Sequence, residues 1–203
     1  CCDMEQWIAG KVADKFARAE ATAFVNGTGA KQPRGFTTYT QKTSSPGVYE
    51  FNKLGTIQTA ASNKLVASEV FDVIGALKAG YRANATWFFN RTTEQEIRKL
   101  TVLDGTDKAD NFIWQPGLSA DTPATLAGYP YAIFEDMGDL ATDNDIFMVF
   151  GDLRRAYTIV DRIGIRILRD PFTSKPYVKF YTTKRVGGGV VNFDALKLVK
   201  AKA

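Results

Sequence analysis

Residues 147–170 read FMVFGDLRRAYTIVDRIGIRILRD, and the pattern of the chain changes within this stretch. It opens with a short apolar run and continues with isoleucine at every second position, at Ile163, Ile165 and Ile167. Alternation with a period of two predicts a long β-strand, because successive side chains of a strand point to opposite faces. A second extended segment, residues 177–183, follows the turn at Asp170-Pro171. The two segments predict a pair of long strands.

Two shorter features follow this pair. Three consecutive glycines, residues 187–189, are expected to end the second long strand before Val190. Residues 196–200 then predict one final strand.

Upstream of the quoted stretch, residues 3–25 predict one long amphipathic helix. Apolar side chains recur there at spacings of three and four, at Met4, Trp7, Ile8, Val12, Phe16, Ala19, Ala23 and Phe24. Asp3 is the expected N-cap, and Asn26-Gly27 is the expected stop in left-handed geometry. At about 1.5 Å per residue, the helix is a rod of roughly 35 Å. A rod of this length suits a spine that crosses an extended protein.

The middle of the chain mixes helical and extended patterns. A helix is expected from Ser68 to Gly80, and another is expected to open at Thr92. Strands are expected at residues 85–90, 112–115 and 132–134, a loop at 118–128, and only short extended pieces such as 48–51 in the polar segment 37–64. The mixture predicts an α+β fold, with mostly antiparallel strands late in the chain.

Composition excludes several classes of function. The 203 residues include 26 Lys and Arg and 22 Asp and Glu, which give a net charge of +4. This charge permits contact with nucleic acid but is smaller than that expected of a dedicated nucleic-acid-binding protein. The chain has no histidine, which excludes His-based catalytic triads and makes a zinc hydrolase untenable.

The remaining signals for ligands are equally weak. The two cysteines, Cys1 and Cys2, are neighbours and predict neither a disulfide nor a metal site. No run of 18 apolar residues and no signal peptide occurs, so no membrane partner is expected. We therefore expect no catalytic, cofactor-binding or metal-binding residue, and no cofactor.

Several motifs occur in a fixed order along the chain: FVNGTGAKQPRG at 24–35, TLAGYPY at 125–131, FGDLRRAY at 150–157, RDPFT at 169–173 and KRVGGGV at 184–190. With the long helix, they extend over nearly the whole chain. In this order they resemble the major capsid proteins of tailed bacteriophages or prophages with the Hong Kong 97 fold.

The resemblance implies an α+β fold with two domains. A peripheral domain would hold the long spine helix and a long-stranded antiparallel sheet, and an axial α/β domain would point to the centre of the capsomer. The resemblance assigns residues 1–51 and 156–186 to the peripheral domain, and residues 52–155 and the return strand 187–203 to the axial domain. Family members also carry an amino-terminal arm and an extended hairpin before the spine helix. Both are expected to be absent here, which would make the chain an amino-terminally truncated form.

The resemblance also implies a structural function without enzyme activity. Such a protein self-assembles into hexamers and pentamers of an icosahedral shell that encloses double-stranded DNA. Its expected partners are copies of itself, a scaffolding segment or protein, a prohead protease, a portal, and the packaged DNA, which it contacts non-specifically. Its expected location is the capsid of the virion, assembled in the cytoplasm of the bacterial host.

Charged residues in and beside the quoted stretch are candidate contacts between subunits. Arg side chains form forked hydrogen bonds with carboxylates, so they suit such contacts. The candidates are Asp161, Arg162, Arg166, Arg169 and Asp170, followed by Arg154 and Arg155. In the alternative interpretation these charges are solvated and pair locally, and each pair then adds about 0–1 kcal/mol of stability.

Three other functions compete with this interpretation. An enzyme would use carboxylate pairs, but no nucleophile or phosphate-binding motif accompanies the available ones, which are Glu94/Glu96, Glu135/Asp136 and Asp143/Asp145. A nucleic-acid-binding module would use the late basic residues Lys184, Arg185, Lys197, Lys200 and Lys202. An encapsulin, the shell protein of a bacterial nanocompartment, would share the fold, although the motifs at 150–157 and 169–173 look more like those of the phage protein.

Overall fold

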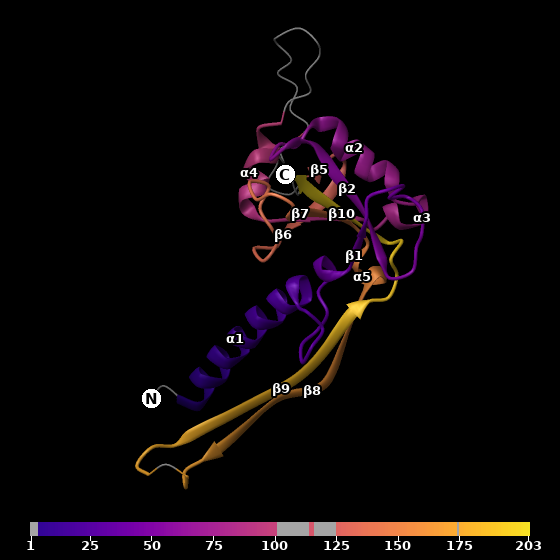
Figure 1. Ribbon diagram of the computed structural model, residues 1–203. Coiled ribbons are helices and arrows are strands. Elements are labelled where there is room, and N and C mark those ends of the chain that lie inside the picture. Colours follow the sequence, from indigo (N-terminus) through magenta and orange to yellow (C-terminus); the bar gives the residue numbers. More distant parts are fainter. Residues whose placement is uncertain (1–3, 101–113, 116–124, 174) are drawn as a thin grey trace. The chain divides into compact units, whose positions relative to one another are not determined.

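The structure is a computed structural model, and it describes residues 4–100, 114–115, 125–173 and 175–203 (Figure 1). The chain forms two compact units. The first unit contains Cys1–Thr38 and Thr158–Val190, and the second contains Tyr39–Tyr157 and Val191–Ala203. Helices and sheets occur together, which confirms the α+β class. Residues 39–51 lie in the second unit, and the peripheral and axial roles of the two parts stay predictions.

The first unit begins with helix α1 (Met4–Asn26), which confirms the long helix. Its expected left-handed stop is wrong, because neither Asn26 nor Gly27 has a positive φ. The helix instead ends where the chain folds back across it, and Gly35 N donates to Gly27 O at 2.8 Å. A Cβ atom on Gly27 would clash with the carbonyl oxygen of Pro33, so this crossing requires glycine.

Further hydrogen bonds hold the crossing in place. The Thr37 hydroxyl donates to Val25 O at 2.6 Å, at the start of the short 3-10 helix η1 (Phe36–Thr38). Arg34 N donates to Gly188 O at 2.9 Å, which joins the end of α1 to the ribbon described next.

Strands β8 (Tyr157–Asp170) and β9 (Lys179–Val190) form a two-stranded ribbon and run in opposite directions in Figure 1. The alternating strand predicted from the isoleucines is confirmed. The expected break at glycines 187–189 is wrong, because β9 continues through them to Val190. The backbone there remains paired, since Gly188 accepts the hydrogen bond from Arg34 and β9 lies beside β8.

The second unit is built on a mixed sheet with the strand order β1-β2-β10-β7-β3-β6-β5-β4. Strand β10 is parallel to β2 and antiparallel to β7, while β3 is antiparallel to β7 and parallel to β6. The strands are β1 (Thr40–Lys42), β2 (Lys53–Ser62), β3 (Thr86–Phe89), β4 (Trp114–Gln115), β5 (Thr125–Leu126), β6 (Tyr129–Ile133), β7 (Ile146–Gly151) and β10 (Leu196–Lys202).

Four helices belong to this unit: α2 (Ala67–Ala76), α3 (Ala79–Arg82), α4 (Arg91–Arg98) and α5 (Leu153–Ala156). The helix expected at 68–80 is confirmed in part, because α2 ends at Ala76, Leu77 is extended, and the short α3 follows. The Glu69 carboxylate accepts from Val66 N at 2.9 Å and from Ala60 N at 2.5 Å, which ties the start of α2 to β2. Asn90 caps α4, since its side-chain oxygen accepts from Thr93 N at 2.8 Å.

The strands predicted for the second unit are only partly correct. Residues 85–90, 132–134 and 196–200 are confirmed in part or whole by β3, β6 and β10. Residues 48–51 are not a strand, and the ten-residue β2 within the polar segment 37–64 was not expected. Cys1, Cys2, the Asp3 N-cap, residues 112–113 of an expected strand and residues 118–124 of the expected loop lie outside the described residues.

The core of the second unit is aromatic at its centre. Trp87 stacks on Phe150 with ring centroids 4.1 Å apart, and its indole nitrogen donates to Leu126 O at 3.2 Å. Phe89 stacks on Tyr131 at 5.4 Å. All six residues of β7 are buried, as expected for a strand with neighbours on both edges and cover on both faces. This unit therefore has the packed interior of an independent domain.

Candidate functional site

The first unit exposes much of its apolar surface. Its buried hydrophobic residues, among those that the structure describes, are Val25, Phe36 and Val190. In contrast, Trp7 on α1 is 62% exposed, and Phe172 beyond β8 is 81% exposed. The other exposed large side chains of this unit are Met4, Ile159, Val160, Ile165, Ile167, Leu168, Tyr177, Val178 and Tyr181. Exposed apolar patches of this kind usually mark surfaces that bind other macromolecules.

Five of the charged candidates lie along β8, within this apolar surface. Arg162, Arg166 and Arg169 are exposed, and Asp161 lies 4.0 Å from Lys184 of β9. The ribbon therefore combines exposed arginines with exposed isoleucines, a composition typical of binding surfaces rather than of a solvated edge.

Asp170 has a local structural role at the end of β8. Its carboxylate accepts hydrogen bonds from Phe172 N at 2.9 Å, from Thr173 N at 3.2 Å and from the Thr173 hydroxyl. The Thr173 hydroxyl and these amides lower the pKa of the Asp170 carboxyl. The side chain thus shapes the turn that presents Phe172.

The last two candidates are not brought together with the other five. Arg154 and Arg155 lie in α5 of the second unit, where the Asp152 side chain accepts from Arg155 N at 3.3 Å. The Arg155 side chain also pairs with the Asp152 carboxylate at 3.5 Å. Both arginines line a hollow of about 490 Å³ with Asn84 and Asp152.

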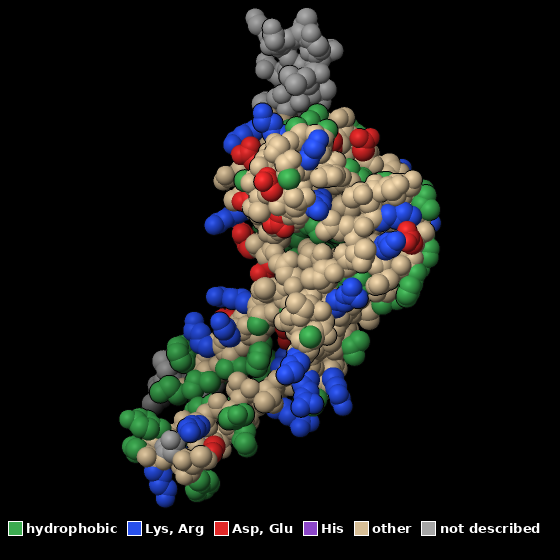
Figure 2. Space-filling view, in the orientation of Figure 1, with side chains coloured by type: hydrophobic (Ala, Val, Ile, Leu, Met, Phe, Trp, Pro, Cys, Tyr) green, Lys and Arg blue, Asp and Glu red, His purple; other side chains and the backbone are tan. Residues whose placement is uncertain are grey.

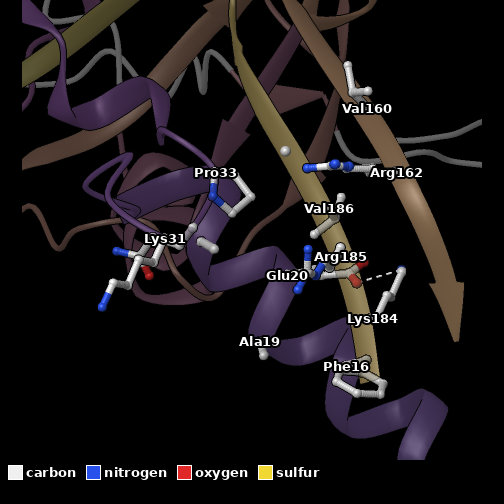
Figure 3. Close-up of a pocket in the computed structure, with 13 residues that line it drawn as sticks. Phe16, Ala19, Glu20, Lys31, Pro33, Val160, Arg162, Lys184, Arg185 and Val186 are labelled. Carbon is white, nitrogen blue, oxygen red and sulfur yellow. Dashed lines mark ion pairs between the residues drawn. The ribbon is translucent and has the colours of Figure 1, made fainter. Parts of the chain in front are cut away.

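A groove of about 790 Å³ lies in the first unit between α1, the crossing segment and the ribbon (Figure 3). Its apolar lining comes from Phe16, Ala19, Ala23, Pro33, Val160 and Val186. Four cations line it as well: Lys31 from the segment after α1, Arg162 from β8, and Lys184 and Arg185 from β9. We call this the basic groove. Of the groove residues, Arg162 is a subunit contact predicted from the sequence, and Lys184 and Arg185 are among the late basic residues named there.

Glu20 is the acidic residue of the basic groove, and it is already paired. Its carboxylate lies 2.5 Å from Lys184 Nζ, and both side chains are mostly buried, at 19% and 16% exposed. The Glu20 carboxylate raises the pKa of Lys184, so this lysine remains charged at neutral pH. The ion pair is drawn as a dashed line in Figure 3 and holds β9 against α1.

The carboxylate pairs considered for an enzyme are engaged in surface contacts. Glu94 pairs with Arg98 at 2.7 Å and Glu96 pairs with Lys99 at 2.7 Å. Glu135 lies 3.6 Å from Arg91. Within the described ranges, no group of three or more Asp, Glu, Cys and His residues could hold a metal ion.

The late basic residues are not all exposed. Lys197 is buried, at 1% exposed, and burial lowers its pKa. It therefore cannot serve the nucleic-acid-binding alternative. Lys202 Nζ donates to Ala60 O at 3.1 Å, near the end of β2. None of the described helices is long and apolar enough to cross a membrane.

Comparison with known proteins gives a consistent result. The model of the phage capsid family matches residues 2–201. The solved capsid of an empty gene transfer agent (GTA) particle is 44% identical, with a TM-score of 0.86 over 99% of this chain and 67% of that chain. The capsid of the native GTA particle gives the same identity and TM-score over 66% of its chain. This chain thus spans about two thirds of the length of these relatives.

A structure from Gordonia phage Cozz is 15% identical, with a TM-score of 0.59 over 98% of this chain and 64% of that chain, and it shows a shared fold alone. No curated protein sequence gives a significant match.

Proposed function

Because this chain belongs to the phage capsid family, we propose that it is a major head protein whose copies assemble into a closed shell. The observation that carries this proposal is the exposed apolar surface of the first unit, on α1 and on the β8–β9 ribbon. The similarity to the GTA capsids, at 44% identity over nearly the whole chain, supports the same role.

The ribbon needs a partner on physical grounds. An isolated two-stranded ribbon is at best marginally stable in water, because neither face is covered. Side chains are exposed at most positions of β8, including Ile165 and Leu168, and Tyr181 of β9 is exposed as well. Contacts with neighbouring copies would cover this surface, and a closed symmetric shell repeats each such contact many times.

The finer features of the proposal follow from the family. We expect hexamers and pentamers in an icosahedral shell that encloses double-stranded DNA without sequence-specific contacts. A scaffolding segment or protein, a prohead protease and a portal would take part, and assembly would occur in the cytoplasm of the bacterial host. The first unit would supply most of the peripheral domain and the second unit most of the axial domain. Hong Kong 97-type geometry is part of this proposal.

The charged candidates take their place in the same proposal. Arg162, Arg166 and Arg169 would form contacts to carboxylates of neighbouring copies, since all three are exposed beside apolar side chains. Asp170 and Asp161 would contribute through the turn and the Lys184 pair described above. Arg154 and Arg155 would act at a separate contact, in the second unit.

The decisive test is electron microscopy and analytical ultracentrifugation of the full-length protein, expressed at high concentration, as wild type and as Trp7→Ser. We expect shells, pentamers or hexamers from the wild type. Because Trp7 is 62% exposed, its replacement by Ser should weaken assembly by about tenfold or more in concentration while leaving the melting temperature of the unassembled protein nearly unchanged.

Trp7→Phe is the matched control, since it keeps an apolar ring and should assemble nearly as the wild type does. A wild type that stays monomeric with scaffold and protease supplied would refute the shell role. A steeply salt-dependent affinity for DNA in that monomer would favour the nucleic-acid-binding alternative. Shells that co-purify with a cargo enzyme would favour an encapsulin.

A further inference from the structure

The basic groove carries more positive charge than its own chain neutralises. Lys184 is paired with Glu20 and lies near Asp161, but Lys31, Arg162 and Arg185 have no ion pair with any described carboxylate. These three cations stand around apolar walls that include Phe16 and the valines of both strands. A ligand that fits must therefore bring several negative charges together with apolar or uncharged atoms.

The second unit contains a segment with this chemistry. The loop 134–145, between β6 and β7, has five acidic residues and no Lys or Arg, namely Glu135, Asp136, Asp139, Asp143 and Asp145. We call it the acidic loop. Glu135 and Asp143 are exposed, and residues 141–144 form an exposed stretch. Figure 2 shows acidic side chains gathered along one edge of this unit.

The acidic loop is held in shape by its own unit. Met137 and Leu140 are buried, at 4% and 5% exposed, and anchor the loop to the core. Gly138 N donates to Ile146 O at 3.2 Å, and Asn63 donates to the Asp143 carboxylate at 3.0 Å. A loop that is already ordered loses little entropy when it binds, which favours association.

The two units also differ in net charge. The first unit has 12 Lys and Arg against 6 Asp and Glu, a net charge of +6, whereas the second has 14 against 16, a net charge of −2. These values add to the +4 of the chain. The basic groove and the acidic loop carry opposite charges, which steer two copies toward a head-to-tail contact, in which each copy offers a different surface to the next.

We propose that the basic groove of one copy binds the acidic loop of the next copy. The proposal rests on the shell-forming function proposed above and names one of its contacts. Arg162 and Arg185 pair with the exposed carboxylates of the loop, while the apolar walls contact its uncharged residues, including Ala141 and Thr142. A DNA phosphate backbone would satisfy the cations but would leave the apolar walls without a partner, so a second copy fits the groove better.

Charge reversal on both sides gives a sharp test with the full-length protein. The groove variant is Arg162→Glu with Arg185→Glu, and the loop variant is Glu135→Lys with Asp143→Lys. In each variant two like charges face each other across the contact, so we expect the concentration needed for assembly to rise at least about tenfold. Lys15→Glu with Arg18→Glu is the matched control, since these exposed residues of α1 change the net charge equally but do not line the groove.

Mixing the variants identifies the partner. An equimolar mixture of groove and loop variants restores opposite charges at contacts between copies, as does one chain that carries all four changes. We expect the four-change chain to assemble within about threefold of the wild-type concentration, because each of its contacts is again attractive. The mixture should assemble at a lower concentration than either variant alone, because contacts between unlike copies are attractive. Melting temperatures of the unassembled variants verify that all are folded.

Several outcomes would overturn the proposal. If the groove variant assembles normally, or if neither the mixture nor the four-change chain assembles, the proposed contact does not exist. Restoration in the four-change chain but not in the mixture would place loop and groove within one chain. Loss of DNA binding by the groove variant with unchanged assembly would make the groove a DNA site. A wild type that does not assemble would instead refute the shell function itself.

Discussion

Lys197 is a cation in the interior of the second unit, in the strand β10. It is 1% exposed, and its aliphatic stem and amino group lie over Gly55, where a Cβ atom would be 3.0 Å from Lys197 Cδ. Burial lowers its pKa, Asp194 opposes this shift, and Lys78 and Lys42 reinforce it. Asp194 already has a closer partner, since its carboxylate lies 2.6 Å from Lys78 Nζ. The charge of Lys197 therefore costs stability.

Replacement of Lys197 by Met should stabilise the second unit by about 1–2 kcal/mol at pH 7, because the apolar part is kept and the buried charge is removed. A pKa lowered in the folded state means that the unfolded state binds more protons below the ordinary lysine pKa of about 10.4. The stability of the wild type then rises with pH in this window, so the advantage of Lys197→Met should shrink toward pH 10. Urea unfolding of the wild type and of Lys197→Met at pH 7 and pH 10 measures the stability difference at each pH. A variant that is less stable than the wild type at pH 7 would show that the attraction between Lys197 and Asp194 outweighs the cost of burying the charge.

Helix α1 and its crossing segment illustrate how an element depends on single glycines. Gly27 lies against the backbone of Pro33, and a Cβ atom on Gly27 would clash with Pro33 O and with Ala23 O. Gly10 lies in the same helix, and a Cβ atom on it would meet nothing within 4 Å. The two positions therefore respond oppositely to the same substitution.

Gly27→Ala should destabilise the protein by about 1–3 kcal/mol, because the backbone must move to admit the methyl group. Gly10→Ala should stabilise α1 by up to about 1 kcal/mol, through the higher helix propensity of Ala. Thermal unfolding followed by circular dichroism compares them. Equal effects at both positions would show that the crossing is not a tight contact.

The sequence predicted the elements whose side chains have a clear period. The apolar spacing of α1 and the isoleucine alternation of β8 were sufficient, and the helix expected to open at Thr92 is α4, which begins at Arg91. Strand β2 was missed because its buried positions are filled by small or polar residues, such as Thr56 and Thr59, that give no apolar alternation. Its place beside β10, far away in the chain, makes it a strand.

The candidate site was predicted only in part, for a related reason. Arg162 was identified because it belongs to a cluster of charged residues in the predicted long strand, where Arg side chains suit contacts with carboxylates of another subunit. The basic groove was not, because it forms only where the segment after α1 brings Lys31 and Pro33 against the ribbon. The hydrogen bond from Arg34 N to Gly188 O fixes this arrangement, and no local pattern encodes it.

At the scale of the whole molecule, the uneven distribution of charge sets how association should respond to salt. The first unit carries +6, and the acidic loop of the second unit has five carboxylates and no Lys or Arg, so attraction between these parts of two copies is screened as ionic strength increases. We expect the concentration needed for assembly to rise several-fold between about 50 mM and about 500 mM NaCl, where the Debye length falls from roughly 13 Å to about 4 Å. Sedimentation velocity at salt concentrations across this range measures the concentration needed for assembly. Association that is insensitive to salt would show that the apolar surfaces alone drive assembly.

The position of β10 has a consequence for synthesis on the ribosome. This strand lies between β2 and β7, yet it follows the β8–β9 ribbon in the chain. Until it is translated, the strands of the second unit form two separate pieces, each with an open edge. The sheet can therefore close only after the ribbon has left the ribosome. The exposed apolar surface of the ribbon is thus already present while the sheet of the second unit is still incomplete.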